Sequence, residues 1–179
     1  MLHSNTERLI DYWRAQKRDR LSPPRDAIDP GEITELLPQV FILGRATGGQ
    51  YLFRLAGGLV SDLHRRDLRS VDFAVLWAPE DRPRLIAAME AARRAAEPLV
   101  LTVEARNALA SVRVEMLLAP LRSQSAPLDR YIGLLQPLAP LSALAGRPVA
   151  ELALTRFASS IERDGPRLRL AAVDGQLIA

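Results

Sequence analysis

Two short apolar runs flank a glycine-rich turn and decide the fold. They are Val40-Phe41-Ile42-Leu43 and Tyr51-Leu52-Phe53-Arg54-Leu55-Ala56, and Thr47-Gly48-Gly49-Gln50 separates them. β-branched and aromatic residues favour extended strands, and glycine takes the positive φ angles that a tight hairpin requires. The stretch therefore predicts a β-hairpin.

Three further strand-like runs follow Pro98 and predict a meander. They cover residues 99–104, 112–116 and 131–135, and the middle run alternates between apolar and polar residues. A helix is predicted over 79–96, because Leu85, Met89, Ala92 and Ala96 share one face. Two strands and three strands separated by helices indicate an α+β fold, with one five-stranded antiparallel sheet and helices on one face.

The regions before and after this core have sequence patterns of helices and of a linker. Ser4-x-x-Glu7 resembles a capping box that opens a helix at about 5–19. A second helix start at Asp29-Pro30 is followed by a stop at Pro38. We therefore divide the chain into an N-terminal helical extension (1–38), a core (39–138), and a linker with a C-terminal arm (139–179). The alternation of Arg167-Leu168-Arg169-Leu170 suggests an edge strand in that arm.

Composition excludes several function classes. The 179 residues contain no cysteine and two histidines, which excludes disulfides, thiol catalysis, iron–sulfur clusters and a His-based zinc site. No long uncharged apolar window or secretory signal is present, so we expect a cytoplasmic protein without a membrane partner. The net charge is only +3, and the basic residues are not concentrated enough to predict a nucleic-acid partner.

The order of elements resembles that of a PAS domain, and several motifs resemble one family of small stand-alone PAS-like proteins, chiefly alphaproteobacterial. The matching motifs are Tyr12-Trp13, Ile28-Asp29-Pro30, Leu36-Leu37-Pro38, Val40-Phe41-Ile42-Leu43, Phe53-Arg54-Leu55-Ala56-Gly57 and Arg66-Asp67-Leu68. The resemblance covers about residues 5–138. It implies a PAS fold with an N-terminal helical extension, a sensing or signalling role, and no catalytic activity.

A ligand cavity between the sheet and its helices is one prediction, and a filled core is the alternative. Aromatic residues and methionine suit an adaptable pocket, but they also suit plain packing. The residues expected to face this space are Phe53, Leu55, Phe73, Trp77, Met89, Leu101, Val103, Val114 and Met116.

Three other groups of residues carry alternatives. Arg65, Arg66 and Arg69 either bind an anion or nucleotide, or pair with nearby aspartates on a solvated face. Leu9, Ile10 and Trp13 either cover the sheet of their own chain or dock on a second copy in a homodimer. His64 is either a ligand or pH-sensitive residue, or an exposed helix residue among charges.

The sequence therefore predicts a non-enzymatic PAS-type sensory or regulatory module. It would bind a small molecule or a protein signalling partner, and would signal through its helical extension or a dimer interface. The alternatives are a ligand-free protein-interaction module and anion binding at Arg65, Arg66 and Arg69. No cofactor is assigned, and no glycine-rich phosphate loop is present.

Overall fold

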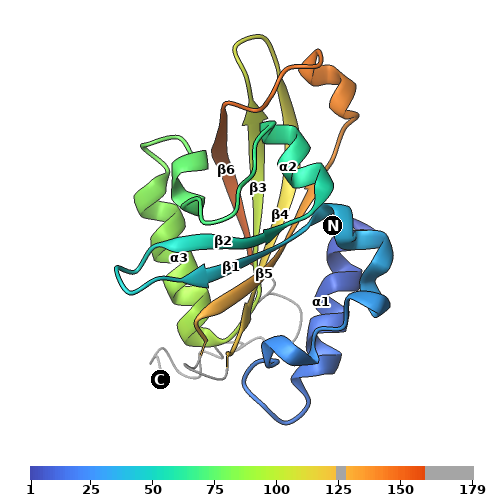
Figure 1. Cartoon of the computed structure of the whole chain (residues 1–179), viewed down its shortest axis with the longest axis vertical. Coiled ribbons are helices and arrows are strands. Elements are labelled where there is room, and N and C mark those ends of the chain that lie inside the picture. The colour runs from blue at the N-terminus through green and yellow to red at the C-terminus, as the bar shows by residue number, and fades with distance from the viewer. Residues whose placement is uncertain (124–127, 160–179) are drawn as a thin grey trace, which may run out of the picture.

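The computed structural model describes residues 1–123 and 128–159, and they form one antiparallel sheet of six strands with helices on both of its faces (Figure 1). The strand order is β2-β1-β5-β4-β3-β6. The strands are β1 (Val40–Arg45), β2 (Tyr51–Ala56), β3 (Leu99–Arg106), β4 (Ser111–Leu121), β5 (Arg130–Pro137) and β6 (Glu151–Ser159). The predicted α+β fold is confirmed.

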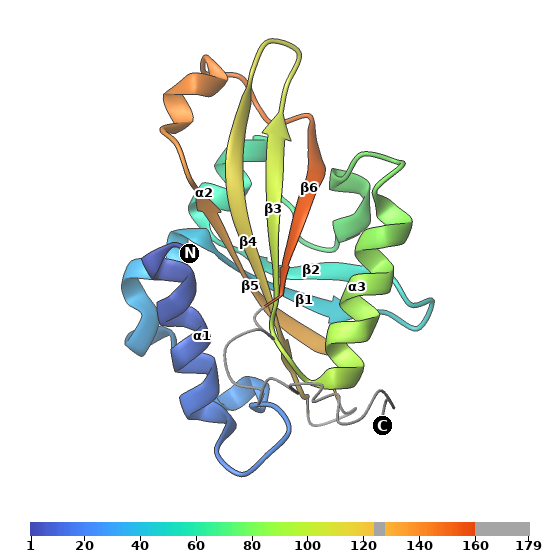
Figure 2. The same ribbon diagram turned by 180° about the vertical axis from the view of Figure 1, so that it is seen from behind.

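The helices separate into two groups, one on each side of the sheet (Figure 2). The helix α1 and the 3-10 helix η2 cover one face, and α2, η3 and α3 cover the other. The bounds are α1 (Ser4–Lys17), η1 (Arg25–Ala27), η2 (Pro30–Gln39), α2 (Gly58–His64), η3 (Phe73–Leu76), α3 (Arg82–Ala95) and η4 (Leu141–Leu144). In the described part of the chain, no helix is both long and apolar enough to cross a membrane.

The prediction of five strands is corrected to six. Residues 151–159 form β6, which pairs with β3 from Arg106↔Glu151 to Leu99↔Ser159. Its inward residues include Leu152 and Leu154, which alternate with Glu151, Ala153 and Thr155. The predicted edge strand at 167–170 lies outside the described residues.

The core on the α3 side of the sheet contains most of the aromatic rings. Phe41, Phe53 and Phe73 have ring centroids 5.6 to 5.8 Å apart, and Trp77 lies 5.6 Å from Phe73. Phe41 faces Gly133 across the β1–β5 pair. A Cβ atom at Gly133 would lie 2.1 Å from the Phe41 ring, so the Phe41 ring can occupy this position only because residue 133 is a glycine.

The core on the α1 side is smaller and mostly aliphatic. Leu9, Ile10 and Trp13 of α1 pack on strand residues that include Val100 and Leu117. The Trp13 indole Nε1 donates a 2.8 Å hydrogen bond to the Pro120 carbonyl oxygen. α1 is therefore fixed to the sheet by one apolar stripe and by this buried indole bond.

The first turn of α1 adds polar contacts that the predicted capping box does not describe. The helix cap is His3, whose Nδ1 accepts a hydrogen bond from the Asn5 amide at 3.1 Å. The His3 amide donates to Glu115 Oε1 at 2.9 Å, and the Asn5 side chain donates to Gln136 Oε1 at 2.9 Å. Since Glu115 and Gln136 face each other across β4 and β5, these bonds hold the start of α1 on the centre of the sheet.

Candidate functional site

Eight of the nine predicted cavity residues lie together in the core between the sheet and α3. They are buried, with exposed fractions of at most 1%, and they belong to one continuous apolar cluster. They come from β2, η3 and the residue after it, α3, β3 and β4: Phe53, Phe73, Trp77, Met89, Leu101, Val103, Val114 and Met116. These eight side chains therefore face the space between the sheet and its helices, where they pack against one another.

Leu55 is the exception, and its prediction as a cavity residue is wrong. Its side chain is 47% exposed. Leu43 pairs with Phe53 and Ile42 pairs with Leu55, so Arg54 is an extra residue in β2. A one-residue bulge turns the following side chain to the opposite face of the sheet. Leu55 consequently lies beside Ile42, on the α1 side.

One buried polar atom stands out in this core. The Trp77 indole Nε1 is buried and has no hydrogen-bond partner among the described residues. The neighbouring rings pack against Trp77 without offering an acceptor. A buried indole N–H usually has a partner, so Trp77 departs from the usual pattern.

A polar cluster closes the core where α3 meets β1 and β2. The Tyr51 hydroxyl donates a 2.6 Å hydrogen bond to Glu90 Oε1, and Arg93 Nη2 lies 2.8 Å from Glu90 Oε2. Partial burial raises the pKa of Glu90, but the bonds from Tyr51 and Arg93 outweigh it and hold that pKa below its ordinary value. Burial and the adjacent Glu90 raise the pKa of Tyr51. With Glu90 ionised, the cluster therefore connects α3 to the β1–β2 hairpin.

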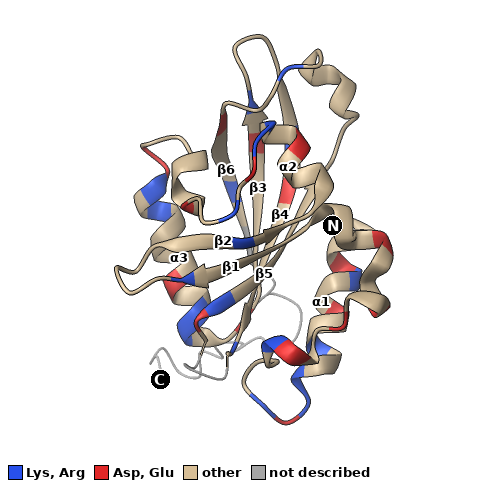
Figure 3. Cartoon of the chain, viewed as in Figure 1, with Lys and Arg blue, Asp and Glu red and all other residues tan. Residues whose placement is uncertain are grey.

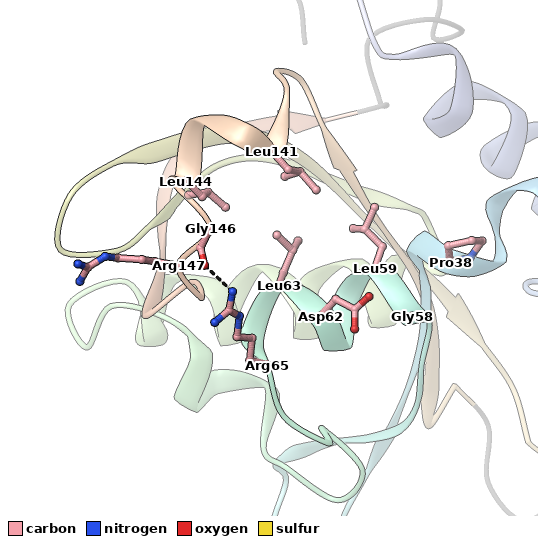
Figure 4. A pocket seen from close by; sticks show the side chains of 10 residues that line it. All are labelled: Pro38, Gly58, Leu59, Asp62, Leu63, Arg65, Leu141, Leu144, Gly146 and Arg147. Carbon is pink, nitrogen blue, oxygen red and sulfur yellow. Dashed lines mark hydrogen bonds between the residues drawn. The ribbon is translucent and has the colours of Figure 1, made fainter.

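The described residues also form a groove outside the core, between α2 and η4 (Figure 4). Its volume is about 560 Å³. Leu59 and Leu63 of α2 face Leu141 and Leu144 of η4, while Pro38 closes one end. Sequence reasoning missed this groove because η4 lies in a segment interpreted as a linker. The leucine pair at 141 and 144, at helical spacing, is the signal that could have revealed it.

Charged groups stand at the rim of this groove. Arg65 and Arg147 line it together with Asp62. Arg65 takes a left-handed conformation at the end of α2 (φ 47°), and its Nη2 donates to the Gly146 carbonyl oxygen. This bond joins α2 to the chain after η4. The groove is thus apolar at its base and mainly basic at its edge.

Of the three arginines considered as an anion site, only Arg65 lines the groove. Arg65 lines the groove, but Arg66 and Arg69 do not line it and are exposed. Figure 3 shows basic and acidic residues interspersed along most of the helices and strands. Among the described residues, no group of three His, Asp or Glu side chains is placed to hold a metal ion.

His64 is buried, which corrects the description of an exposed helix residue. Its exposed fraction is 8%. Burial lowers the pKa of His64, a hydrogen bond with the Val149 backbone partly opposes this, and Arg66 adds to the lowering, so that the resulting pKa is about 4. His64 is therefore neutral at pH 7 and acts as part of the packing between α2 and the chain that leads into β6.

The predicted interface residues cover the sheet of their own chain. Leu9, Ile10 and Trp13 have exposed fractions of 0%, 4% and 1%. A second copy cannot reach them while α1 lies on the sheet. The structure of the single chain thus has the alternative in which these three side chains cover their own sheet.

The sheet order, the helices between β2 and β3, and the helical extension define a PAS-type fold. The family model described as "PAS domain" matches residues 1–136. This chain belongs to the PAS domain family. The matched range includes α1 and ends one residue before the end of β5, so η4 and β6 lie beyond it.

Solved structures of similar shape are light-oxygen-voltage (LOV) domains of low sequence identity. The dark structure of the Aureochrome1 LOV domain is 16% identical, with a TM-score of 0.47, over 62% of this chain and 83% of that chain. The Rhodobacter sphaeroides LOV protein is 11% identical, with a TM-score of 0.47, over 66% of this chain and 74% of that chain. No curated protein matches the sequence.

Proposed function

We propose that this chain is a non-enzymatic sensory or regulatory module that binds a small molecule in the groove between α2 and η4 and signals through α1. The observation that carries the proposal is a continuous path of contacts from the groove through η2 to α1. Membership of the PAS domain family supports the general role. The path identifies which parts of this chain would perform it.

The first step of the path joins the groove to η2. Gly57, immediately before α2, lies so close to η2 that a Cβ atom there would be 2.2 Å from the Leu37 carbonyl oxygen and 2.4 Å from that of Pro38. Pro38 itself lines the groove. Because packed backbones at this distance cannot move independently, a shift of α2 on ligand binding would displace the end of η2.

The second step joins η2 to α1. Ile33 and Leu36 of η2 belong to the same apolar cluster as the buried stripe of α1. Arg8 Nη1 lies 2.9 Å from Glu35 Oε2, and the Tyr12 hydroxyl accepts a 2.8 Å bond from the Asp29 amide. The position of α1 on the sheet therefore depends on the position of η2.

The groove indicates the ligand chemistry. Its base presents leucine side chains from two helices, and its rim presents Arg65 and Arg147 against Asp62. Such a site suits an amphipathic small molecule with an apolar body and an anionic end. Release of α1 would expose its apolar stripe to a protein signalling partner or to a second copy. We place this module in the cytoplasm, in keeping with its lack of cysteine.

The test begins with native mass spectrometry and thermal-shift screening of the purified protein against amphipathic carboxylates, for example medium-chain fatty acids. Binding should be lost in Leu141→Glu, which places a charge in the groove. It should persist in Leu138→Glu, a matched control whose side chain is 42% exposed and does not line the groove. Ligand should also change hydrogen exchange in residues 4–17.

A protein that carries no molecule and shows no thermal shift across the panel would support the ligand-free interaction module instead. Binding that leaves exchange in residues 4–17 unchanged would refute the path to α1. Gly57→Ala should alter that exchange without ligand. Gly58→Ala is the matched control, because a Cβ atom there meets no other atom within 4 Å.

A further inference from the structure

A second pocket, at the opposite end of the sheet from η4, is lined by four arginines. Its volume is about 630 Å³. Arg20 and Arg25 come from the chain after α1, Arg122 follows the end of β4, and Arg130 begins β5. These segments meet at the same end of the molecule (Figures 1 and 2). Asp26 and Ser123 complete the polar lining.

Backbone hydrogen bonds fix three of these arginines relative to one another. The Arg25 amide donates to the Arg122 carbonyl oxygen at 2.9 Å, and the Arg122 amide donates to the Pro23 carbonyl oxygen at 3.0 Å. Arg130 pairs with Leu121 across β4 and β5. The segment around Arg25 is therefore attached to the sheet, and the side chains of Arg25, Arg122 and Arg130 start from anchored positions.

The four guanidinium groups have no hydrogen bond or ion pair with any described residue. Other arginines of the chain do, for example Arg45 and Arg93 with Glu90, and Arg106 with Glu151. Asp129 is nearby in sequence, but its carboxylate accepts bonds from the Ser123 amide at 3.1 Å and the Ser123 hydroxyl at 2.8 Å. The described lining thus carries four positive charges against Asp26 alone.

We propose that this pocket binds a compact oligophosphate, either free or as the phosphate chain of a nucleotide. The planar guanidinium group donates paired hydrogen bonds that match phosphate oxygens. Four such groups around one pocket match a ligand with several adjacent anionic groups. The described lining includes no aromatic residue, so it offers no surface on which bases of single-stranded nucleic acid would stack.

Isothermal titration calorimetry with inorganic tripolyphosphate tests the site. Arg122→Gln with Arg130→Gln should weaken binding at least tenfold. The matched control is Arg66→Gln with Arg69→Gln, which removes the same charge from two exposed arginines outside the pocket. This control should bind as the unmodified protein does. Arg122→Lys with Arg130→Lys keeps the charge and should still weaken binding severalfold, because lysine lacks the paired donors.

Two further arms identify the source of the phosphates. If a nucleoside triphosphate binds as tightly as tripolyphosphate, the pocket recognises the phosphate chain alone. If the nucleoside triphosphate binds much more tightly, the natural ligand is a nucleotide. Equal weakening by the pocket pair and the control pair would overturn the proposal, and so would absence of tripolyphosphate binding at low salt. A single-stranded RNA that outcompetes tripolyphosphate would overturn it in favour of a nucleic-acid surface. Thermal unfolding of each apo variant verifies that it is folded.

Discussion

The two faces of the sheet are held in different ways. On the α3 side, rings from β1, β2 and η3 interlock, and Glu90 joins α3 to the hairpin. On the α1 side, one apolar stripe, the Trp13 indole bond and the polar contacts of His3 and Asn5 hold α1 beside η2. The first face is built as a core, and the second as a docked element. From this difference we expect that α1 can be released from its face of the sheet while the core on the other face stays folded.

The largest expected effect is on the α3 side. Phe73→Ala should lower the free energy of unfolding by about 3–5 kcal/mol, because it leaves a cavity amid three other rings. Urea denaturation followed by circular dichroism measures the loss. Val75→Ala, in the same short helix but 49% exposed, should change it by less than about 0.5 kcal/mol. A similar small loss for Phe73→Ala would mean that this face is not the principal core.

The next effect concerns the docked helix. Trp13→Ala should cost about 3 kcal/mol, at the lower end for a buried tryptophan, since only α1 loses its contacts. Hydrogen exchange should rise in residues 4–17 and much less in β3 and β4. Arg14→Ala, on the exposed side of α1, should leave exchange nearly unchanged. An equal rise across the whole sheet would show that the two faces unfold as one unit.

A pH change should act first on the α3 side of the sheet. The pKa of His64 is about 4 in the folded protein, below the ordinary 6.5, so the unfolded chain binds more protons between these values. Stability attributable to His64 is present above about pH 6.5 and is lost as the pH falls toward 4. Between pH 7 and 5 the loss should be about 2 kcal/mol. His64→Gln should lack this part of the dependence in urea titrations. If both proteins lose stability in parallel, burial of His64 is not the cause.

The smallest effect compares one acidic residue on each side. Glu90→Gln should cost about 1 kcal/mol at pH 7, while Glu35→Gln, whose ion pair with Arg8 is largely exposed, should cost less than about 0.5 kcal/mol. Because the folded pKa of Glu90 is lowered, its contribution is present above its unfolded pKa and disappears as the pH falls through the folded value. The difference between Glu90→Gln and the unmodified protein should therefore shrink at pH 3. A difference that is constant with pH would assign the effect to packing.

The sequence predicted the α3 side of the molecule better than its ends. Alternating apolar residues identify which side chains of β3 and β4 face inward, so Leu101, Val103 and Val114 were placed correctly. Leu55 was misplaced because a bulge depends on the register of two strands, which one strand's pattern does not contain. β6 was missed because proline and glycine around residues 140–148 dominate the local signal.

The candidate sites were harder to predict than the fold. Both pockets are lined by residues distant in sequence, such as Leu59 with Leu144 and Arg25 with Arg122. Only the tertiary structure brings such residues together. The arginines adjacent in sequence, Arg65, Arg66 and Arg69, face different surroundings because the left-handed residue at the end of α2 redirects the chain.

The two outer strands of the sheet have a consequence for assembly. At the outer edge of β2, the Ser70 amide donates a 2.8 Å hydrogen bond to the Phe53 carbonyl oxygen. The Phe53 amide in turn donates a 3.0 Å hydrogen bond to the Val71 carbonyl oxygen. Outside the first half of β6, the Ala78 amide donates to the Leu152 carbonyl oxygen at 2.8 Å, and the Leu154 amide donates to Asp81 Oδ2 at 2.7 Å.

Exposed strand edges are templates for unwanted growth of a sheet from one molecule into the next. Here the chain occupies these edge positions with its own backbone and with Asp81. An incoming strand would have to displace those bonds before it could pair. The edge of β2 at Phe53 and the first half of β6 are thereby occupied, so strand addition at these positions would be disfavoured.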